Sequence, residues 1–433
     1  MQIPILKVMY RFRNITKIIF FLLLIQFIGY NAKAAYILIP MDEQQKNHLK
    51  SYGIAYWTLQ NSIEVKWLLN YRGGSFMVQY FKEIETECVI RDVSYNVIAD
   101  VQADNILNQI ALPEVNMDAI KLEKAPKIAV YSPKDKLPWD DAVTLALTYA
   151  EIPYDIIYDE EIISGALSKY DWLHLHHEDF TGQYGKFYGA YNHMKWYQDQ
   201  VHNSEAKAKE LGFNKVSELK LQVALNIKQY VTNGGFLFAM CSATDSYDIA
   251  LSAQRVDICA NVFDGDPMDT DAQERLNFDE TFAFKDFILS KNPYEYEFSS
   301  IDVTQTRKIS EENDYFTLFE FSAKWDPVPT MLCQNHETLV KGFMGQTTAF
   351  NKDYVKSDVL IMGENKAANE ARYIHGEFGK GTWTFYGGHD PEDYRHYVGD
   401  RHTELDLYPN SPGYRLILNN VLFPAAKKKK MKT

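Results

Sequence analysis

Short apolar runs alternate with segments of helical pattern through the middle of the chain. The apolar runs have the length of buried strands and are Lys127–Tyr131, Tyr154–Tyr158, Asp171–His177 and Gly235–Met240. Helical segments separate them: Asp140–Ala150, Glu160–Ser168 and a long region of about Ser204–Val231 that ends at Asn233-Gly234-Gly235. Strands that alternate with helices predict βαβ units, in which a parallel sheet is covered by helices on both faces.

The last part of the chain predicts a hairpin and a closing helix. Two strand-like runs, Ala371–Phe378 and Thr382–Tyr386, are joined by the turn Gly379-Lys380-Gly381. A loop follows Gly387-Gly388-His389, and the pattern becomes helical again at Gly413–Val421.

The flanking regions follow different patterns. Short α/β pieces before residue 125 predict a small N-terminal module, and the charged stretch Glu114–Lys127 predicts a linker. Residues 261–370 are acidic and aromatic, with short runs such as Tyr315–Phe321, and predict a β-rich insertion. The expected division is 1–34 signal peptide, 35–125 N-terminal module, 126–260 first part of the main domain, 261–370 insertion, and 371–433 C-terminal part.

The first residues predict export from the cytoplasm. A basic start without acidic residues precedes an apolar run, Ile18–Ile28, and the small-residue site Ala32-Lys33-Ala34, so Ala35 would be the new N-terminus. The alternative is an uncleaved anchor, but a membrane span takes about 20 apolar residues. We expect a periplasmic or extracellular location.

The charge of the chain limits the classes of partner that it is expected to bind. The net charge is −13, and removal of the basic leader makes the chain more acidic still. This balance disfavours nucleic acid, whose phosphates need a basic surface, and anionic lipid surfaces beyond export. The basic tail Lys427–Lys430 is interpreted as a solvated end. The sequence makes no prediction of oligomeric state.

The cysteines are widely spaced and fit no zinc pattern. At most one disulfide is expected among Cys88, Cys259 and Cys333. Cys241 is left out of this pairing because it is a candidate nucleophile. No cofactor and no metal ion is predicted.

Cys241 lies between an apolar strand and a helical segment, Ser242–Ala253. A side chain on such a sharp turn is held above the sheet, and the positive end of the helix dipole favours the thiolate. A cysteine nucleophile needs a base, and His389 follows a predicted strand, with Glu392 and Asp393 near enough to orient it. Because ligands bind beyond the carboxyl ends of parallel strands, Cys241 and His389 are expected to meet there.

This order of strand, Cys turn, insertion, hairpin, Gly-Gly-His-x-Pro-Glu and helix resembles the class I glutamine amidotransferase-like superfamily, over roughly Lys127 to Phe423. The resemblance implies a flavodoxin-like sheet, with Cys241 as nucleophile, His389 as base and Glu392 as its orienting group. The family's usual elbow glycines are Ala239 and Ala243 here, and Asp390 is an extra residue.

The whole chain also resembles exported bacterial proteins often labelled asparagine synthetase B. Synthetases of that name need an N-terminal cysteine nucleophile and a Ser-Gly-Gly-x-Asp-Ser pyrophosphate loop. Residue 2 is Gln2, and the loop motif does not occur in the sequence.

Polar and aromatic residues after the strand Asp171–His177 are the candidate substrate contacts. Strand alternation places His174 and His176 on one side and His177 on the other, so at most two of them would share a metal, and buried or strand-end histidines are the favoured interpretation. The candidate substrate-binding residues at this strand end and in the aromatic loop are His177, Glu178, Gly182 and Tyr184.

These observations predict an exported amidotransferase-like hydrolase that acts on an amide through a thioester at Cys241. The alternative is a catalytically inactive protein of the same fold that binds a small molecule or carbohydrate-like ligand in the crevice.

Overall fold

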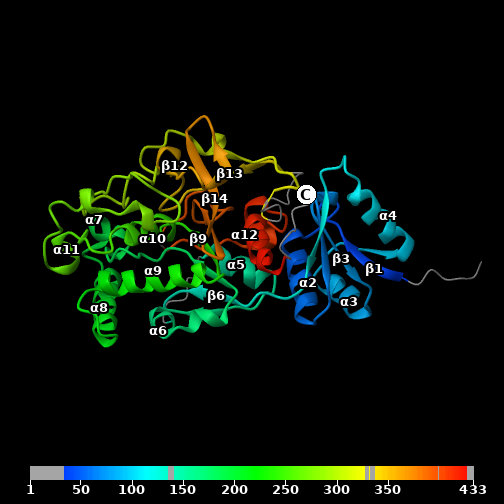
Figure 1. Cartoon of the computed structure of the whole chain (residues 1–433), viewed down its shortest axis with the longest axis horizontal. Coiled ribbons are helices and arrows are strands. Elements are labelled where there is room, and N and C mark those ends of the chain that lie inside the picture. The colour runs from blue at the N-terminus through cyan, green and yellow to red at the C-terminus, as the bar shows by residue number, and fades with distance from the viewer. Residues whose placement is uncertain (1–33, 135–140, 327–330, 332–336, 398, 427–433) are drawn as a thin grey trace, which may run out of the picture.

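The computed structural model describes residues 34–134, 141–326, 331, 337–397 and 399–426. The chain folds as an α/β protein with two sheets (Figure 1). The predicted leader, Cys333 and the lysine tail lie outside the described residues, apart from Ala34. Within the described ranges, no helix is long and apolar enough to cross a membrane.

The larger sheet contains the predicted parallel run. Its strand order β7-β6-β8-β9-β15 is the order 2-1-3-4-5 of flavodoxin-like folds, and each neighbouring pair in this run is parallel. The strands are β6 (Ile128–Tyr131), β7 (Asp155–Ile157), β8 (Trp172–Leu175), β9 (Phe236–Met240) and β15 (Gly381–Tyr386). Their nearly continuous apolar sequences fit a sheet that is buried on both faces.

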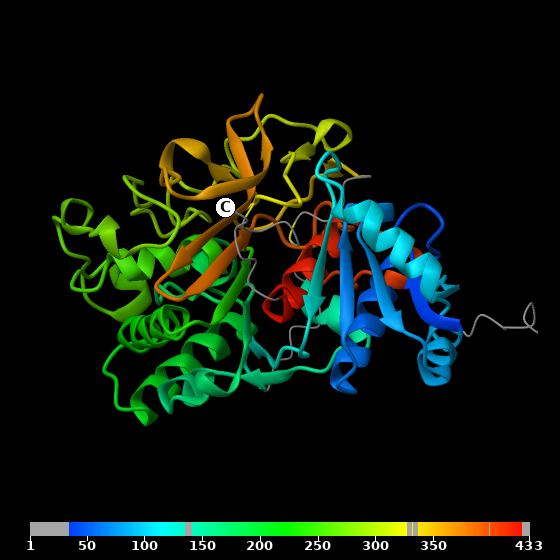
Figure 2. The ribbon, with the colours of Figure 1, turned by 45° about the vertical axis from the view of Figure 1, so that its right-hand side comes forward.

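The predicted insertion extends this sheet. The confirmed hairpin of β14 (Glu370–Phe378) and β15 pairs antiparallel, and the added strands continue from β14 in the order β13-β10-β11, with β12 on β14 as well. Figure 2 shows these strands rising beside the parallel run. The remaining strands are β10 (Tyr315–Leu318), β11 (Leu339–Lys341), β12 (Phe350–Asn351) and β13 (Leu360–Asn365).

Helices cover both faces of the parallel run. The core on one face includes residues of α5 and α12, and the core on the other includes residues of α6, α9 and α10. In α9, residues 219, 223, 224, 227 and 231 are buried, a helical spacing that turns one apolar stripe to the sheet. The bounds are α5 (Ala142–Tyr149), α6 (Asp159–Ile163), α7 (Tyr188–Tyr191), α8 (Lys195–Glu210), α9 (Val216–Thr232), α10 (Ala243–Ser252), α11 (Asn261–Asp264) and α12 (Pro412–Leu422).

The N-terminal module is a separate antiparallel sheet in the order β4-β1-β3-β2-β5. Helix α12 lies between this module and the main sheet in both views, where it contacts α2 and α5 (Figures 1 and 2). The elements are β1 (Ala34–Ile39), α2 (His48–Gln60), β2 (Val65–Leu69), β3 (Ser75–Gln79), α3 (Lys82–Ile90), β4 (Asn96–Ala99), α4 (Asp100–Ala111) and β5 (Asp118–Leu122).

Two sequence predictions of elements are wrong. The long helix expected at 204–231 is two helices, because Gly212 adopts a left-handed φ of 87° just after α8 ends. The expected linker Glu114–Lys127 contains strand β5, whose apolar positions pair with β2. The thiols of Cys88, Cys241 and Cys259 are free and buried.

Candidate functional site

Polar side chains collect where the parallel strands end. Asp141 comes after β6 and directly before α5, His176 and His177 directly follow β8, Cys241 directly follows β9, and His389 follows β15 after two glycines. The carboxyl ends of parallel strands meet at one edge of the sheet, where such folds bind ligands. This edge is the candidate functional site.

Asp141 places a buried carboxylate in the site, and hydrogen bonds hold that carboxylate in position. Its Oδ1 accepts hydrogen bonds from the backbone N–H groups of Val143 (2.7 Å) and Thr144 (2.9 Å), so Asp141 is the N-cap of α5. His174 Nε2 lies 3.0 Å from Oδ2, and His176 Nδ1 lies 3.4 Å from Oδ1. Burial alone would raise the pKa of Asp141, but the two histidines hold it well below its ordinary value.

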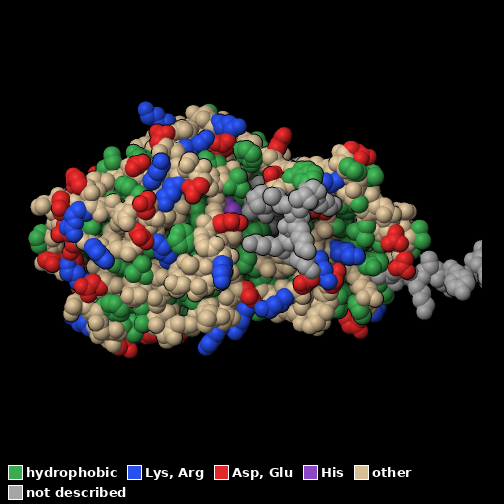
Figure 3. All heavy atoms as spheres, viewed as in Figure 1, with side chains coloured by type: hydrophobic (Ala, Val, Ile, Leu, Met, Phe, Trp, Pro, Cys, Tyr) green, Lys and Arg blue, Asp and Glu red, His purple; other side chains and the backbone are tan. Residues whose placement is uncertain are grey.

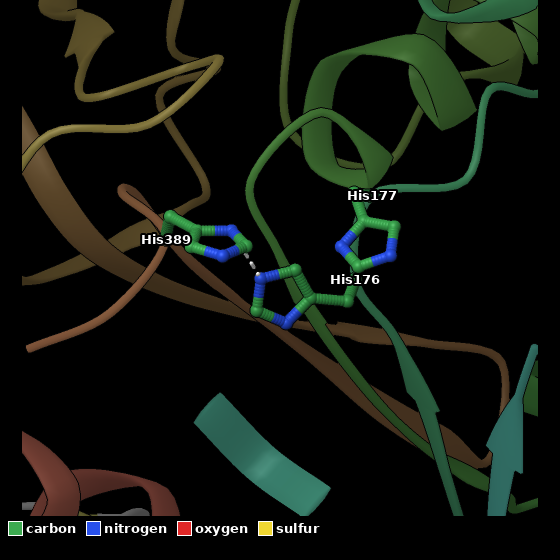
Figure 4. Close-up of side chains that lie close together, drawn as sticks. All are labelled: His176, His177 and His389. Atoms are coloured by element: carbon green, nitrogen blue, oxygen red, sulfur yellow. Dashed lines mark hydrogen bonds between the residues drawn. The ribbon is translucent and has the colours of Figure 1, made fainter. Parts of the chain in front are cut away.

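His176 connects Asp141 to His389. Its Nε2 lies 2.9 Å from His389 Nδ1, and the two rings are nearly perpendicular, at 81° (Figure 4). Burial lowers the pKa of His176 to about 3, so its ring is neutral at pH 7. With the carboxylate of Asp141 on the Nδ1 side, we assign the proton to Nδ1, which leaves the Nε2 lone pair facing His389.

His177 completes a group of three imidazoles. Its ring centre lies 4.9 Å from that of His176 and 5.9 Å from that of His389, and each residue offers a nitrogen within 4.8 Å of the others. Figure 4 shows His176 and His177 at the end of one strand and His389 on a separate loop. The sequence prediction that alternation would separate His176 from His177 is wrong, because β8 ends at Leu175 and the chain turns there.

The residues predicted to orient His389 have contacts with other side chains near it. Asp393 accepts from His396 Nδ1 at 2.7 Å, and the His396 ring stacks on His389 at 4.8 Å. The Glu392 carboxyl accepts a hydrogen bond from the Ser411 hydroxyl, and burial raises the pKa of Glu392. The His389 ring is hydrogen bonded to His176.

Cys241 forms the expected turn between β9 and α10. Its φ of 52° is left-handed, its N–H donates to Gly388 O at 3.2 Å, and Ala243 N–H donates to His176 O at 2.9 Å. The turn therefore holds both histidine-bearing segments by backbone hydrogen bonds. Burial raises the Cys241 pKa to about 12, despite the N–H groups of Ser242 and Gln346 at its sulfur, so the thiolate expected from the helix dipole is disfavoured.

The remaining predicted substrate contacts lie around this edge or behind it. The Glu178 carboxyl accepts from Tyr158 Oη at 3.2 Å, and burial raises its pKa. Gly182 has a left-handed φ of 82° and lies against Ser217. The Tyr184 ring is buried, with its centre 6.3 Å from the Tyr197 ring in the core on the α9 face.

Sequence reasoning did not consider Asp141 or His396 as functional candidates, and it set His176 aside as a buried or strand-end histidine. Asp141 carried a usable signal, since an aspartate directly before a helix that follows a strand is both an N-cap and a residue of the ligand-binding edge. On the face in Figure 3, a histidine side chain is visible near the middle of the molecule, with an acidic side chain close to it.

The comparisons with known proteins give only distant likenesses. No family model and no curated protein matches the chain. The cytoplasmic protein STM3548 from Salmonella typhimurium is 12% identical, with 70% of this chain and 100% of that chain covered and a TM-score of 0.33. The cytoplasmic protein STM1381 from Salmonella typhimurium LT2 is also 12% identical, with the same coverage and a TM-score of 0.30.

A third solved structure is the GH42 β-galactosidase Gan42B from G. stearothermophilus. It is 12% identical and has a TM-score of 0.26, with 61% of this chain and 28% of that chain covered.

Proposed function

We propose that this chain is a hydrolase of small molecules whose active site is the edge where β6, β8, β9 and β15 end. The observation that carries the proposal is the series Asp141, His176 and His389, in which each group contacts the next and all are buried. An imidazole held from behind in this way is suited to take a proton from a nucleophile and give it to a leaving group. The amidotransferase-like order of elements favours an amide as the substrate.

A second route uses the thiol of Cys241, and the left-handed backbone at the strand-to-helix turn favours it. In this route Sγ attacks the amide carbon, the sulfur proton passes to His389 and then to the departing amine, and water releases the acid from the thioester. The raised pKa of Cys241 means that the proton must leave during the attack.

The test is ammonia release from glutamine, asparagine and simple primary amides by the purified protein. We expect His389→Ala to lower the rate by about 10²–10⁴-fold, the range for loss of a general acid–base group. The matched control is His202→Ala, which removes an exposed histidine on α8 and should leave the rate unchanged.

Cys241→Ala separates the two routes. Loss of all turnover supports the thioester route, and retained turnover assigns the reaction to the histidine group without the thiol. If the wild-type protein hydrolyses no amide, ester or glycoside but binds a ligand that His389→Ala also binds, the hydrolase proposal fails and the alternative of a catalytically inactive binding protein replaces it.

A further inference from the structure

We propose that His176, His177 and His389 bind one divalent transition-metal ion of the zinc class. The site coincides with the proposed active site, but the inference concerns binding, which is measured separately from turnover.

The donor set suits this class of ion. Neutral imidazole nitrogens prefer zinc, copper, nickel and iron over magnesium and calcium. Three protein ligands with the fourth position left for water or substrate is the usual arrangement of catalytic zinc, whereas structural sites use four. Three imidazoles around one ion would therefore leave one coordination position open for water or substrate.

The spacing is close to what the ion needs. Zinc–nitrogen bonds of about 2.0–2.1 Å in a tetrahedron separate two nitrogens by about 3.3 Å. His176 Nε2 and His389 Nδ1 are 2.9 Å apart, and the farthest pair in the group lies within 4.8 Å. Rotation of the His177 and His389 rings would have to bring the three nitrogens around one ion. The ion would replace the hydrogen bond between His176 and His389, so His389 would act as a base only in the metal-free protein.

The surroundings of His176 also fit. Metal-binding histidines usually turn their second ring nitrogen to a carboxylate, which fixes the tautomer and makes the ring a better ligand. Asp141 has this place, 3.4 Å from His176 Nδ1. Asp141 is itself held by the N-terminus of α5 and by His174, so the outer partner is fixed before an ion arrives.

One other group of ligating side chains among the described residues is a weaker candidate because a lysine occupies it. In the group Asp257, Cys259 and Asp264, both carboxylates already contact a cation: Lys215 Nζ lies 2.7 Å from Asp257 Oδ2 and 3.0 Å from Asp264 Oδ2. An ammonium in that position competes with a metal ion. The three-histidine group instead has the carboxylate of Asp141 behind it, 3.4 Å from His176 Nδ1.

The experiment is metal titration of the purified, chelator-treated protein. Isothermal titration calorimetry with Zn²⁺ and the visible spectrum of added Co²⁺ should both show one ion per chain, and the ion should raise the melting temperature. His177→Ala, at a half-buried position, should keep the fold by circular dichroism and lose tight binding. His202→Ala on α8 should bind like wild type.

Asp141→Asn tests the outer partner. Loss of a carboxylate behind a metal-binding histidine lowers affinity by about 10–100-fold, so this variant should bind, but more weakly than wild type. Equal uptake by wild type and His177→Ala, or no stoichiometric uptake by folded wild type, would overturn the inference. Zinc uptake, with no hydrolysis by either the metal-free or the zinc-loaded protein, keeps this site and ends the proposed function. Full hydrolysis by metal-free protein that takes up no ion does the reverse.

Discussion

At the scale of single residues, Asp141 determines how the site is arranged. One buried carboxylate caps a helix and faces two imidazoles, so helix position and histidine orientation depend on the same two oxygens. Structural and functional roles therefore coincide in this residue, and an Asp141 variant has to be checked for stability as well as for binding.

Lys186 gives a prediction of pH dependence. Its buried ammonium donates to Ser290 O and Asn292 O, and burial lowers its pKa to about 8, although Glu295, Asp179, Glu297 and Cys259 act in the opposite direction. Between pH 8 and its ordinary value of 10.5, the unfolded chain binds the proton and the folded chain does not, so stability rises with pH. Relative to Lys186→Met, wild type should gain about 2 kcal/mol from pH 8 to pH 10.

Urea unfolding of both proteins at several pH values measures this difference. A difference that stays flat or falls over the same interval would show that Lys186 keeps its proton in the fold.

The sequence pattern predicted which residues lie at part of this edge of the sheet. His389 and Cys241 follow from their places after apolar strands, and the structure joins their segments through the Gly388 carbonyl. The contact of His176 with His389 was not predictable, because it depends on strand order across the sheet rather than on neighbours in the chain. The high pKa of Cys241 depends on tertiary burial, which outweighs the local helix dipole.

At the scale of elements, left-handed glycines decide where helices and loops end. The hairpin and the main-domain helices α5, α6, α9, α10 and α12 were predictable from apolar spacing and glycine pairs. The division between α8 and α9 was missed because the pattern stays polar and helical on both sides of Gly212, whose φ of 87° makes the break.

Two glycines should respond differently to alanine. A Cβ at Gly212 would meet nothing within 4 Å, so Gly212→Ala should cost only the left-handed strain, about 1–2 kcal/mol. A Cβ at Gly388, with φ of 102°, would come within 2.4 Å of the Phe343 ring, which should add about 1–3 kcal/mol and displace His389. Chemical unfolding and Zn²⁺ titration of both variants check this. Equal losses of stability in Gly212→Ala and Gly388→Ala would contradict the expected clash with Phe343.

At the scale of the whole molecule, buried polar contacts join the N-terminal module to the main domain. Arg415 of α12 donates from Nε to Tyr52 Oη at 3.1 Å, from Nη1 to Met41 O at 3.2 Å, and from Nη2 to Gly73 O. An exposed hydrogen bond from Asn116 Nδ2 to Phe321 O, at 2.8 Å, makes a second connection. The module is thereby attached to both α12 and the inserted segment.

Arg415→Met should destabilise the protein by about 3 kcal/mol, because several buried acceptors lose their donor at once. The exposed Arg395→Met is the control and should change stability by less than about 0.5 kcal/mol. Thermal and urea unfolding of the two variants measure the difference. Similar values for both would mean that the module is held by its apolar contacts alone.

The turn after β9 hydrogen bonds through its backbone to the segments that carry His176 and His389. Main-chain bonds survive a change of side chain, so the distance between these two positions is a property of the scaffold and not of the imidazoles. Replacing the histidines with thiolate or carboxylate residues would then change which ion is selected while the spacing stays the same, and this edge of the sheet becomes a starting point for engineered metalloproteins.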